Sequence, residues 1–311
     1  MVDSVSYTPE EVAKILKISR FTVYELIKRG KLAAYRVGRK VRVEATDLEV
    51  YIQEAKGLGQ SLIYPARQRT EPFFSVNEGL IICGQDIVLD VLTRHLEQQM
   101  PHILFLRNYV GSMAGLLALY HNTANVVTAH LWDSDSDGYN VPYVRRIMPG
   151  HKAMIFNLVY RIEGFYIASG NPKDIHDWSD LTEPGIRFVN REPGAGARVL
   201  LDEKLHKLGI DRNLIEGYSH EERSHLAVAS CVARGKADVG LGIEKVASQV
   251  KGLEFIPLHK ERYDLVIRKE DLEKPHFQAL LSVLRSEAFH SEVAGMGGYD
   301  ISRIGELIAE T

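Results

Sequence analysis

Positive charge is concentrated near the start of this chain. Ten Lys and Arg residues and a single acidic residue, Glu25, lie between Val12 and Val43, although the formal net charge of all 311 residues is −3. The rest of the chain therefore holds 28 basic and 40 acidic residues. Basic side chains repeated at helical spacing are typical of a surface that binds a phosphate backbone. The alternative is a solvated charged face, which is the commoner origin of such a run.

The local pattern around this charge predicts two helices joined by a short link. Thr8 can cap a helix that begins at Pro9, and Glu11 completes a capping box. Ser19 is a second N-cap, and Gly30 is a stop for the helix that Ser19 opens. Such a pair is the geometry of a helix-turn-helix, whose second helix enters the major groove of DNA.

Alternating residues follow the second helix and predict a β-hairpin. Residues 34–37 and 41–43 have the pattern of strands on either side of a Gly-Arg-Lys turn at 38–40. A basic hairpin beside a recognition helix can contact the adjacent phosphate backbone or the minor groove. A third helix is predicted for residues 48–55.

The first 55 residues resemble the DNA-binding domains of the excisionase-like branch of the winged MerR-type group. The matching stretch is YTPEEVAKILKISRFTVYELIKRGKLAAYRVGRKVRVEATDLEVYI. The resemblance implies a winged helix-turn-helix, mainly α with a β-hairpin, that reads bases with the start of its second helix. The reading residues would be Ser19, Arg20, Phe21, Thr22 and Tyr24, and the phosphate contacts would be Lys28, Arg36, Arg39, Lys40 and Arg42. A core position is the alternative for Tyr24.

Length and composition predict the domain organisation. A chain of 311 residues predicts two or three domains. Residues 57–72 have the composition of a linker between a DNA-binding domain of residues 1–56 and a second domain of residues 73–311. No apolar run is long enough for a membrane span, and the polar N-terminus does not resemble a signal peptide. The two cysteines, Cys83 and Cys231, suit buried positions in a reduced, cytoplasmic protein.

The second domain alternates short apolar segments with helical ones, which predicts α/β layers with mostly parallel sheets. Strands are expected near residues 80–84, 103–106, 126–130, 154–159, 165–168, 186–189, 237–240, 253–258 and 263–267. Helices are expected near residues 86–98, 116–121, 197–208, 225–234, 276–286 and 301–309.

Three strand-to-helix loops of this domain have the chemistry of an anion site. They are Gly84-Gln85-Asp86, Gly111-Ser112 and residues 190–198. Each precedes a helix N-terminus, where unpaired N–H groups and the helix dipole favour negative charge. Ser112 adds a hydroxyl donor, and Arg191 and Arg198 can add positive charge. The alternatives are that a glycine-rich loop is only a turn, and that Arg198 is a structural salt-bridge partner.

Residues from about 75 to 305 resemble the substrate-binding domain related to periplasmic molybdate-binding proteins. The segments that carry the resemblance are CGQDIVLDVL, NYVGSMAGLLAL, YNVPYVRRIMPG, GNPKDIHDWSDLTEPGIRFVNREPGAGARVLLDEKL and HLAVASCVARGKADVGLG. The resemblance implies an α/β two-lobed periplasmic-binding-protein-like domain with a ligand in the cleft. One lobe would hold residues 73–152 and 256–311, the other residues 153–255, and the crossing strands would be hinges. The cleft residues would be Gln85, Asp86, Gly111, Ser112, Gly194, Ala195, Gly196 and Arg198.

Two features bear on the ligand. The third loop has the sequence Gly-Ala-Gly-Ala where relatives often have Ser or Thr, which leaves binding to backbone N–H groups and Arg198. Asp86 would repel a dianion unless its carboxylate points away or caps the helix.

No metal is expected, because the calcium-like loop that starts at Asp133 has Val144 where a bidentate acid is needed.

Together these patterns predict a ligand-responsive transcription regulator without a cofactor. We expect double-stranded DNA, a small oxyanion such as molybdate or tungstate, and a second copy of the chain as its partners, in a homodimer or higher homo-oligomer. A recombination or DNA-architectural accessory protein is one alternative. A hydrolytic enzyme that uses Ser112, His130 and Asp86 is the other, although no nucleophile motif supports it.

Overall fold

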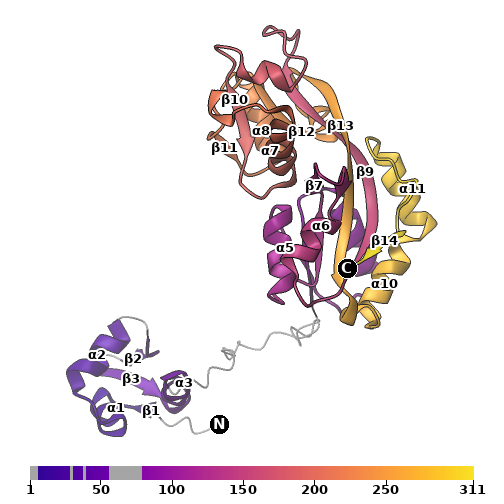
Figure 1. Ribbon diagram of the computed structural model, residues 1–311. Helices are drawn as coiled ribbons and strands as arrows, with labels where there is room; N and C mark the ends of the chain where they lie inside the picture. The colour runs from indigo at the N-terminus through magenta and orange to yellow at the C-terminus, as the bar shows by residue number, and fades with distance from the viewer. Residues whose placement is uncertain (1–5, 29–30, 38–39, 56–78) are drawn as a thin grey trace. The chain divides into compact units, whose positions relative to one another are not determined.

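The computed structural model describes residues 6–28, 31–37, 40–55 and 79–311. Contacts divide the chain into two compact units, which we call unit 1 (residues 1–71) and unit 2 (residues 72–311) (Figure 1). Arg39, the stop at Gly30, the side chains of Lys28 and Arg36, and the linker of residues 57–72 lie outside the described part of the chain. Within the described ranges, no helix has the length and apolar character needed to span a membrane.

Unit 1 contains three helices and a three-stranded antiparallel sheet with the order β1-β3-β2. Its elements are β1 (Ser6–Tyr7), α1 (Pro9–Leu16), α2 (Arg20–Lys28), β2 (Tyr35–Val37), β3 (Lys40–Glu44) and α3 (Ala45–Ala55). The capping box is confirmed, because the Glu11 amide donates to Thr8 Oγ1 at 3.3 Å and the Thr8 amide donates to Glu11 Oε2 at 2.7 Å. Ser19 caps α2, since its Oγ accepts from the Thr22 amide at 3.1 Å.

The core of unit 1 is small and apolar. Its buried members are Val12, Ala13, Val23, Leu32, Val43 and Leu48. Tyr24 is not among them, because its side chain is 38% exposed and its hydroxyl accepts a hydrogen bond from Arg20 Nη2 at 3.4 Å. Tyr24 is therefore a partly exposed residue and does not occupy a core position.

Unit 2 is built on a nine-stranded sheet with the order β11-β10-β12-β9-β13-β6-β4-β5, in which β14 also pairs with β9. The strands are β4 (Leu80–Cys83), β5 (Phe105–Asn108), β6 (Val126–Ala129), β9 (Ala153–Ala168), β10 (Phe188–Arg191), β11 (Glu221–Glu222), β12 (Val239–Ile243), β13 (Leu253–Arg268) and β14 (Leu307–Glu310). Parallel pairs form within β4, β5 and β6 and within β10, β11 and β12. The antiparallel strands β9 and β13 join these two groups, so the predicted two-lobed α/β fold is confirmed.

Lobe 1 contains β4, β5 and β6, and lobe 2 contains β10, β11 and β12. Lobe 1 also holds α4 (Val88–Gln99), α5 (Ser112–Tyr120), α6 (Val141–Ile147), α10 (Pro275–Leu284) and α11 (Glu287–Met296). Lobe 2 holds α7 (Gly196–Leu208), α8 (His225–Ala233) and α9 (Glu244–Ala247). Figure 1 shows α10 and α11 on one side of the long strands and α5 and α6 on the other. Apolar clusters fill both faces of the sheet in each lobe.

The crossing strands β9 and β13 are longer than the sequence predicted. Strands were expected at 154–159 and 165–168 and again at 253–258 and 263–267, and the breaks between them are wrong, because residues 160–164 and 259–262 continue the ladder of β9 with β13. A Cβ at Gly164 would lie 2.0 Å from the Ile256 carbonyl oxygen, so the glycine allows close strand approach and does not end the strand. A register shift between Pro257 and His259 accommodates the proline, which has no N–H to donate.

The C-terminal helix predicted for residues 301–309 is also wrong. Residues 307–310 form β14, which pairs antiparallel with the lobe 1 half of β9. Gly305, with φ of +76°, makes a turn there that a helix cannot contain. The last helix is instead α11, which the sequence analysis missed although Ser286 caps it by accepting from the Phe289 amide at 3.3 Å.

Candidate functional site

A small cavity lies between the lobes of unit 2, where β9 and β13 cross from one lobe to the other. Its volume is about 20 Å³, so it has room for an occupant of a few atoms. The loops after β4, β5 and β6 supply its lobe 1 wall, and the loop after β10 and the start of α8 supply its lobe 2 wall. Arg161 and Tyr263, from the middle of β9 and of β13, complete it.

Six of the eight ligand-binding residues predicted from the sequence line this cavity. They are Gln85, Asp86, Gly111, Ser112, Ala195 and Gly196. The other two, Gly194 and Arg198, do not line it. Gly194 instead contributes its carbonyl oxygen, which accepts from the Met113 amide across the cleft at 3.0 Å.

Two helix N-termini, one from each lobe, face the cavity without a side-chain cap. The N-cap residues are Gly111 for α5 and Ala195 for α7, and neither has a side chain that can accept a hydrogen bond. Apart from the Met113 amide, which donates to the Gly194 carbonyl, the first-turn amides of both helices therefore have hydrogen-bonding capacity to offer beside a buried space. The positive ends of both helix dipoles add to this effect, so the arrangement favours a negatively charged occupant.

Ser112 brings a hydroxyl to the same space. Its side chain is buried, and its Oγ accepts a hydrogen bond from the backbone amide of His130 at 3.3 Å. The hydroxyl proton remains available to an occupant. The imidazole of His130 is turned to Glu261 instead, at 2.6 Å between Nδ1 and Oε2. The hydrogen bonds of the described residues thus do not pair Ser112 with the ring that a hydrolytic mechanism would use as a base.

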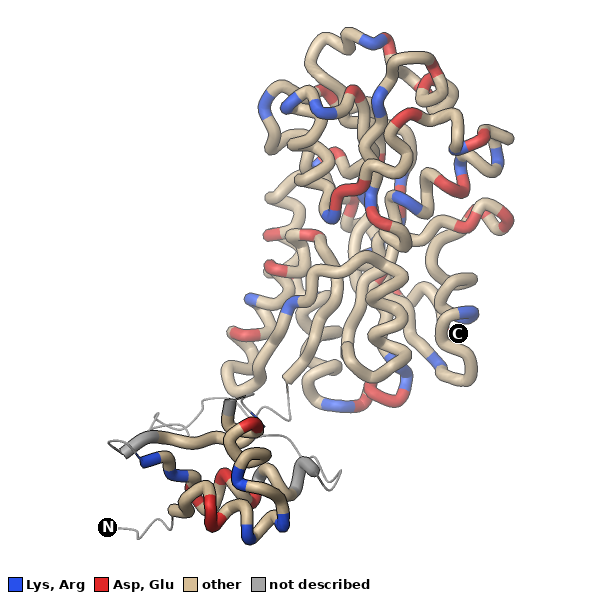
Figure 2. Tube along the Cα trace, turned by 90° about the vertical axis from the view of Figure 1, so that its left-hand side faces the viewer, with Lys and Arg blue, Asp and Glu red and all other residues tan. Residues whose placement is uncertain are grey.

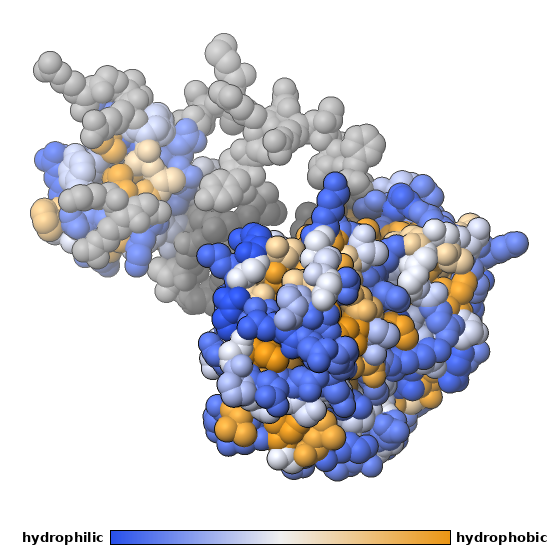
Figure 3. Space-filling view, turned by 90° about the horizontal axis from the view of Figure 1, so that it is seen from above, coloured by the Kyte–Doolittle hydropathy of each residue, from blue (hydrophilic) through white to orange (hydrophobic). Residues whose placement is uncertain are grey.

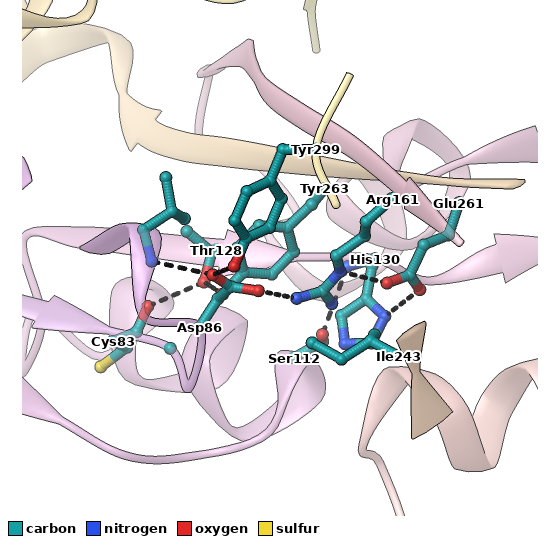
Figure 4. Close-up of polar contacts among 12 residues, drawn as sticks. Cys83, Asp86, Ser112, Thr128, His130, Arg161, Ile243, Glu261, Tyr263 and Tyr299 are labelled. Atoms are coloured by element: carbon teal, nitrogen blue, oxygen red, sulfur yellow. Dashed lines mark hydrogen bonds and ion pairs between the residues drawn. The ribbon is translucent and has the colours of Figure 1, made fainter. Parts of the chain in front are cut away.

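Asp86 does not present a free carboxylate to the cavity. Its Oδ1 accepts from the Val88 amide at 2.8 Å, which caps the start of α4, and from the Tyr299 hydroxyl at 2.7 Å. Its Oδ2 accepts from Arg161 Nη1 (Figure 4). Asp86 therefore need not repel an anionic ligand, because its carboxylate caps the helix and is paired with Arg161.

Arg161 forms a buried ion cluster with Asp86 and Glu261 at the crossing strands. Its Nη1 donates to Asp86 and its Nε to Glu261, and the guanidinium lies 4.1 Å from the centre of the Tyr263 ring (Figure 4). Burial opposes the charge of Glu261, but the Arg161 guanidinium holds the pKa of that carboxyl well below its usual range. Burial lowers the pKa of His130, which favours a neutral imidazole. No hydrogen bond of the described residues uses Arg161 Nη2, which leaves the two N–H groups of that nitrogen available to the cavity.

Glu163 is the member of this cluster whose surroundings favour a neutral carboxyl. Burial and the neighbouring Glu261 raise its pKa well above the usual range, and neither of its carboxyl oxygens has a hydrogen-bond partner among the described residues. His130, Glu163 and Glu261 have ligand atoms within 4.8 Å of one another, as do His220, Glu222 and Cys231. The first group is already occupied by the ion pair to Arg161, so it is not an open metal site in this arrangement.

Hydrogen bonds join the lobes across the cavity. Gln85 Nε2 donates to the Arg223 carbonyl at 3.2 Å, and Arg191 Nη2 donates to Gln85 Oε1 at 2.9 Å. Together with the bond between Met113 and Gly194, they show that the two lobes are closed on each other in this structure.

Arg198 lies away from the cavity. Its Nε contacts both carboxylate oxygens of Asp202 at 3.2 Å, and its guanidinium lies 4.2 Å from the centre of the Tyr218 ring. Arg198 is therefore a structural salt-bridge partner, which was the alternative to a ligand-binding role. Arg191 and Arg161 line the cavity in its place. Arg191 stood in a loop already singled out, whereas Arg161 gave no signal because it fell in the expected gap between two strands.

The predicted DNA-reading residues of unit 1 that the structure describes gather at the start of α2. Phe21 is 75% exposed, which is unusual for an aromatic side chain in so small a unit. Arg20 lies beside it in the chain and forms an ion pair with Glu10 at 2.8 Å. Ser19 and Thr22 are engaged in the cap of α2, with 2.9 Å between their hydroxyl oxygens. Lys and Arg residues occur at several positions along the trace of unit 1 (Figure 2).

Comparisons with known proteins agree with this architecture. Residues 6–56 match the family model of a helix-turn-helix domain, and residues 93–285 match that of a PBP superfamily domain. The Bacillus subtilis protein YvgK is 40% identical over 317 residues, which span 100% of both chains. The Escherichia coli sulfate-binding protein is 27% identical over 119 residues, which are 35% of this chain and 36% of that protein.

Among solved structures, the sulfate-binding protein SubI from Mycobacterium tuberculosis superposes with a TM-score of 0.51 at 16% identity, over 71% of this chain and 86% of that one. At this identity the likeness shows the fold alone. The family matches and the full-length similarity to YvgK go further. The chain belongs to the PBP superfamily and carries a helix-turn-helix domain at its N-terminus.

Proposed function

We propose that this protein is a DNA-binding transcription regulator whose unit 2 senses a small oxyanion. The observation that carries the proposal is the pair of uncapped helix N-termini, of α5 and α7, that face one buried cavity from opposite lobes. Unpaired amides at helix starts bind anions without needing a positively charged side chain. The Ser112 hydroxyl adds a further donor to the same space.

The size and charge of the cavity support an inorganic oxyanion. The volume of about 20 Å³ in this closed arrangement suits a compact occupant better than a nucleotide or an amino acid. Asp86, which lines the cavity, and Glu261 both pair with Arg161, and Arg191 adds a second guanidinium to the lining. Sulfate, phosphate, molybdate and tungstate share the required shape. Molybdate or tungstate is the finer proposal, and it rests on the resemblance of the sequence to molybdate-binding proteins.

Regulation would follow from closure of the lobes. A ligand that contacts the starts of α5 and α7 bridges lobe 1 and lobe 2, so it stabilises the closed arrangement over an open one. Unit 1 would bind DNA as part of a homodimer, with one recognition helix for each half-site. Because coupling is reciprocal, the anion and the DNA must each change the affinity of the protein for the other.

Calorimetry of the full chain with sulfate, phosphate, molybdate and tungstate tests the anion site. Ser112→Ala should weaken binding of the preferred anion by about 1–3 kcal/mol, because it removes one donor to a charged group. Ser248→Ala is the matched control, since the Ser248 hydroxyl donates to the Lys245 carbonyl at 2.8 Å and does not line the cavity. The proposal is wrong if none of the four anions binds at millimolar concentration.

A further inference from the structure

The small cavity opens into a larger hollow between the lobes. This outer chamber has a volume of about 250 Å³, and Gln85, Asp86 and His225 line both spaces. An inorganic oxyanion would occupy the inner cavity alone. The outer chamber is therefore unused by the ligand proposed above.

Apolar side chains from both lobes form much of the chamber wall. Ile87 and Tyr109 come from lobe 1, and Leu226, Ile243 and Val246 come from lobe 2. On the face seen in Figure 3, hydrophobic residues are interspersed with hydrophilic ones, which is ordinary for a protein surface. The convergence of apolar residues from separate elements on one hollow is not ordinary, and it marks a place where apolar surface is covered by something else.

Exposure of these side chains supports that interpretation. Ile87 is 46% exposed, Tyr109 60% and Leu226 53%, although the lobes are already closed. Closure therefore does not bury them. An apolar group placed in the chamber would remove their surface from water, which is favourable in proportion to the area covered.

The chamber also carries positive charge at its rim. Arg223 and Lys245 line it together with the amide of Gln249. The Lys245 ammonium donates to the Met296 carbonyl, while no hydrogen bond of the described residues uses the Arg223 guanidinium. Apolar walls, a cationic rim and an adjoining anion cavity suit a single molecule with an apolar part and an anionic head.

We propose that the anion site also takes an organic oxyanion, a phosphate monoester or sulfonate whose apolar or aromatic substituent occupies the outer chamber. The anionic head lies in the inner cavity against the starts of α5 and α7, and the substituent passes Gln85 and His225 to reach Ile87, Tyr109 and Leu226. This inference rests on the proposed function, because it uses the same anion site and names the class of compound that fills it.

The test compares matched pairs of anions by calorimetry on the full chain. Phenyl phosphate is measured against inorganic phosphate, and benzenesulfonate against sulfate. We expect the aromatic member of at least one pair to bind about tenfold or more tightly than its inorganic partner, because its ring is buried against apolar surface.

A double substitution in the chamber tests whether the tighter binding of the aromatic compound comes from the chamber and not from the anion site. Tyr109→Asn with Leu226→Asn should remove most of the preference for the aromatic compound and leave the inorganic partner unchanged. Leu208→Asn with Leu214→Asn is the matched control, since these leucines are 54% and 64% exposed and do not line the chamber. The control should bind all four compounds as the unaltered protein does.

The outcomes distinguish the two proposals. If an inorganic anion binds and neither aromatic compound binds more tightly than its partner, the organic ligand is refuted and the anion site stands. The same conclusion follows if molybdate or tungstate alone binds. If no inorganic or aromatic anion binds, both proposals fall.

Discussion

A methyl group added at Gly196 should prevent the lobes from closing. Gly196 belongs to lobe 2, and a Cβ built on it would lie 2.4 to 2.5 Å from three atoms of the His130 imidazole in lobe 1. Such distances are far below van der Waals contact, so the ring or the lobe must move. The ring is held by the hydrogen bond between His130 and Glu261 at 2.6 Å and is buried, which makes the lobe the part that gives way.

The size of the effect is estimated from the hydrogen bonds that cross the cavity, apart from other contacts between the lobes such as the one from Lys245 to the Met296 carbonyl. Three hydrogen bonds cross the cavity, one from the Met113 amide and two that involve Gln85. At about 0.5–1.5 kcal/mol each, they represent about 1.5–4.5 kcal/mol of closure free energy. Gly196→Ala should therefore weaken anion binding by about 10- to 1,000-fold. Its free energy of unfolding should change less, since each lobe keeps its own core.

Calorimetry with the preferred anion measures the loss, and urea unfolding measures stability. Gly295→Ala is the control, because Gly295 lies in α11 and a Cβ there would have no heavy atom within 4 Å. That variant should bind like the unaltered protein. Equal anion affinity in Gly196→Ala and Gly295→Ala would refute the argument that the closed arrangement is the one that holds the ligand.

Further substitutions separate the roles of individual side chains. Arg198→Ala should leave anion affinity within about twofold of the unaltered protein, because Arg198 lies outside the cavity, while Ser112→Ala lowers it; calorimetry on both distinguishes them. Glu163 has a raised pKa, so it stabilises the fold below the pKa of an unfolded glutamate and loses that contribution as pH rises through its folded pKa. Urea unfolding of Glu163→Gln should accordingly show a smaller loss of stability than the unaltered protein as pH rises above the usual range of a glutamate carboxyl. In unit 1, Lys40→Ala with Arg42→Ala should flatten the dependence of log K on log salt by about 1.8, if each side chain contacts one phosphate, as measured by fluorescence anisotropy.

The sequence predicted the local structure of unit 1 well because local interactions determine it. The capping box at Thr8 and Glu11 and the cap at Ser19 involve residues three apart in the chain, and the structure contains both. The loops that follow β4, β5 and β10 were also found, since a strand followed by glycine and a helix start is a short-range pattern. Those loops brought six of the eight expected ligand residues to one cavity.

Long-range contacts were beyond sequence reasoning. Residues 160–164 were left between two expected strands, but Gly164 lies opposite Pro257 and lets two strands approach closely. Arg161 stands three residues earlier on the same strand, and its partners Asp86 and Glu261 are 75 and 100 residues away. Arg198 was assigned to the cavity because its loop reaches it. The direction of its side chain depends on Asp202 and Tyr218, which only the folded structure brings around it.

The central claim is that an anion in unit 2 controls DNA binding by unit 1. Its most direct test measures the affinity of the full chain for a duplex selected by the protein from a random pool, with and without the anion that calorimetry identifies. We predict that the anion changes DNA affinity by about fivefold or more, which is the lower end of common coupling energies, and that Ser112→Ala shifts this response to higher anion concentration. Identical DNA affinity with and without saturating anion would contradict the account.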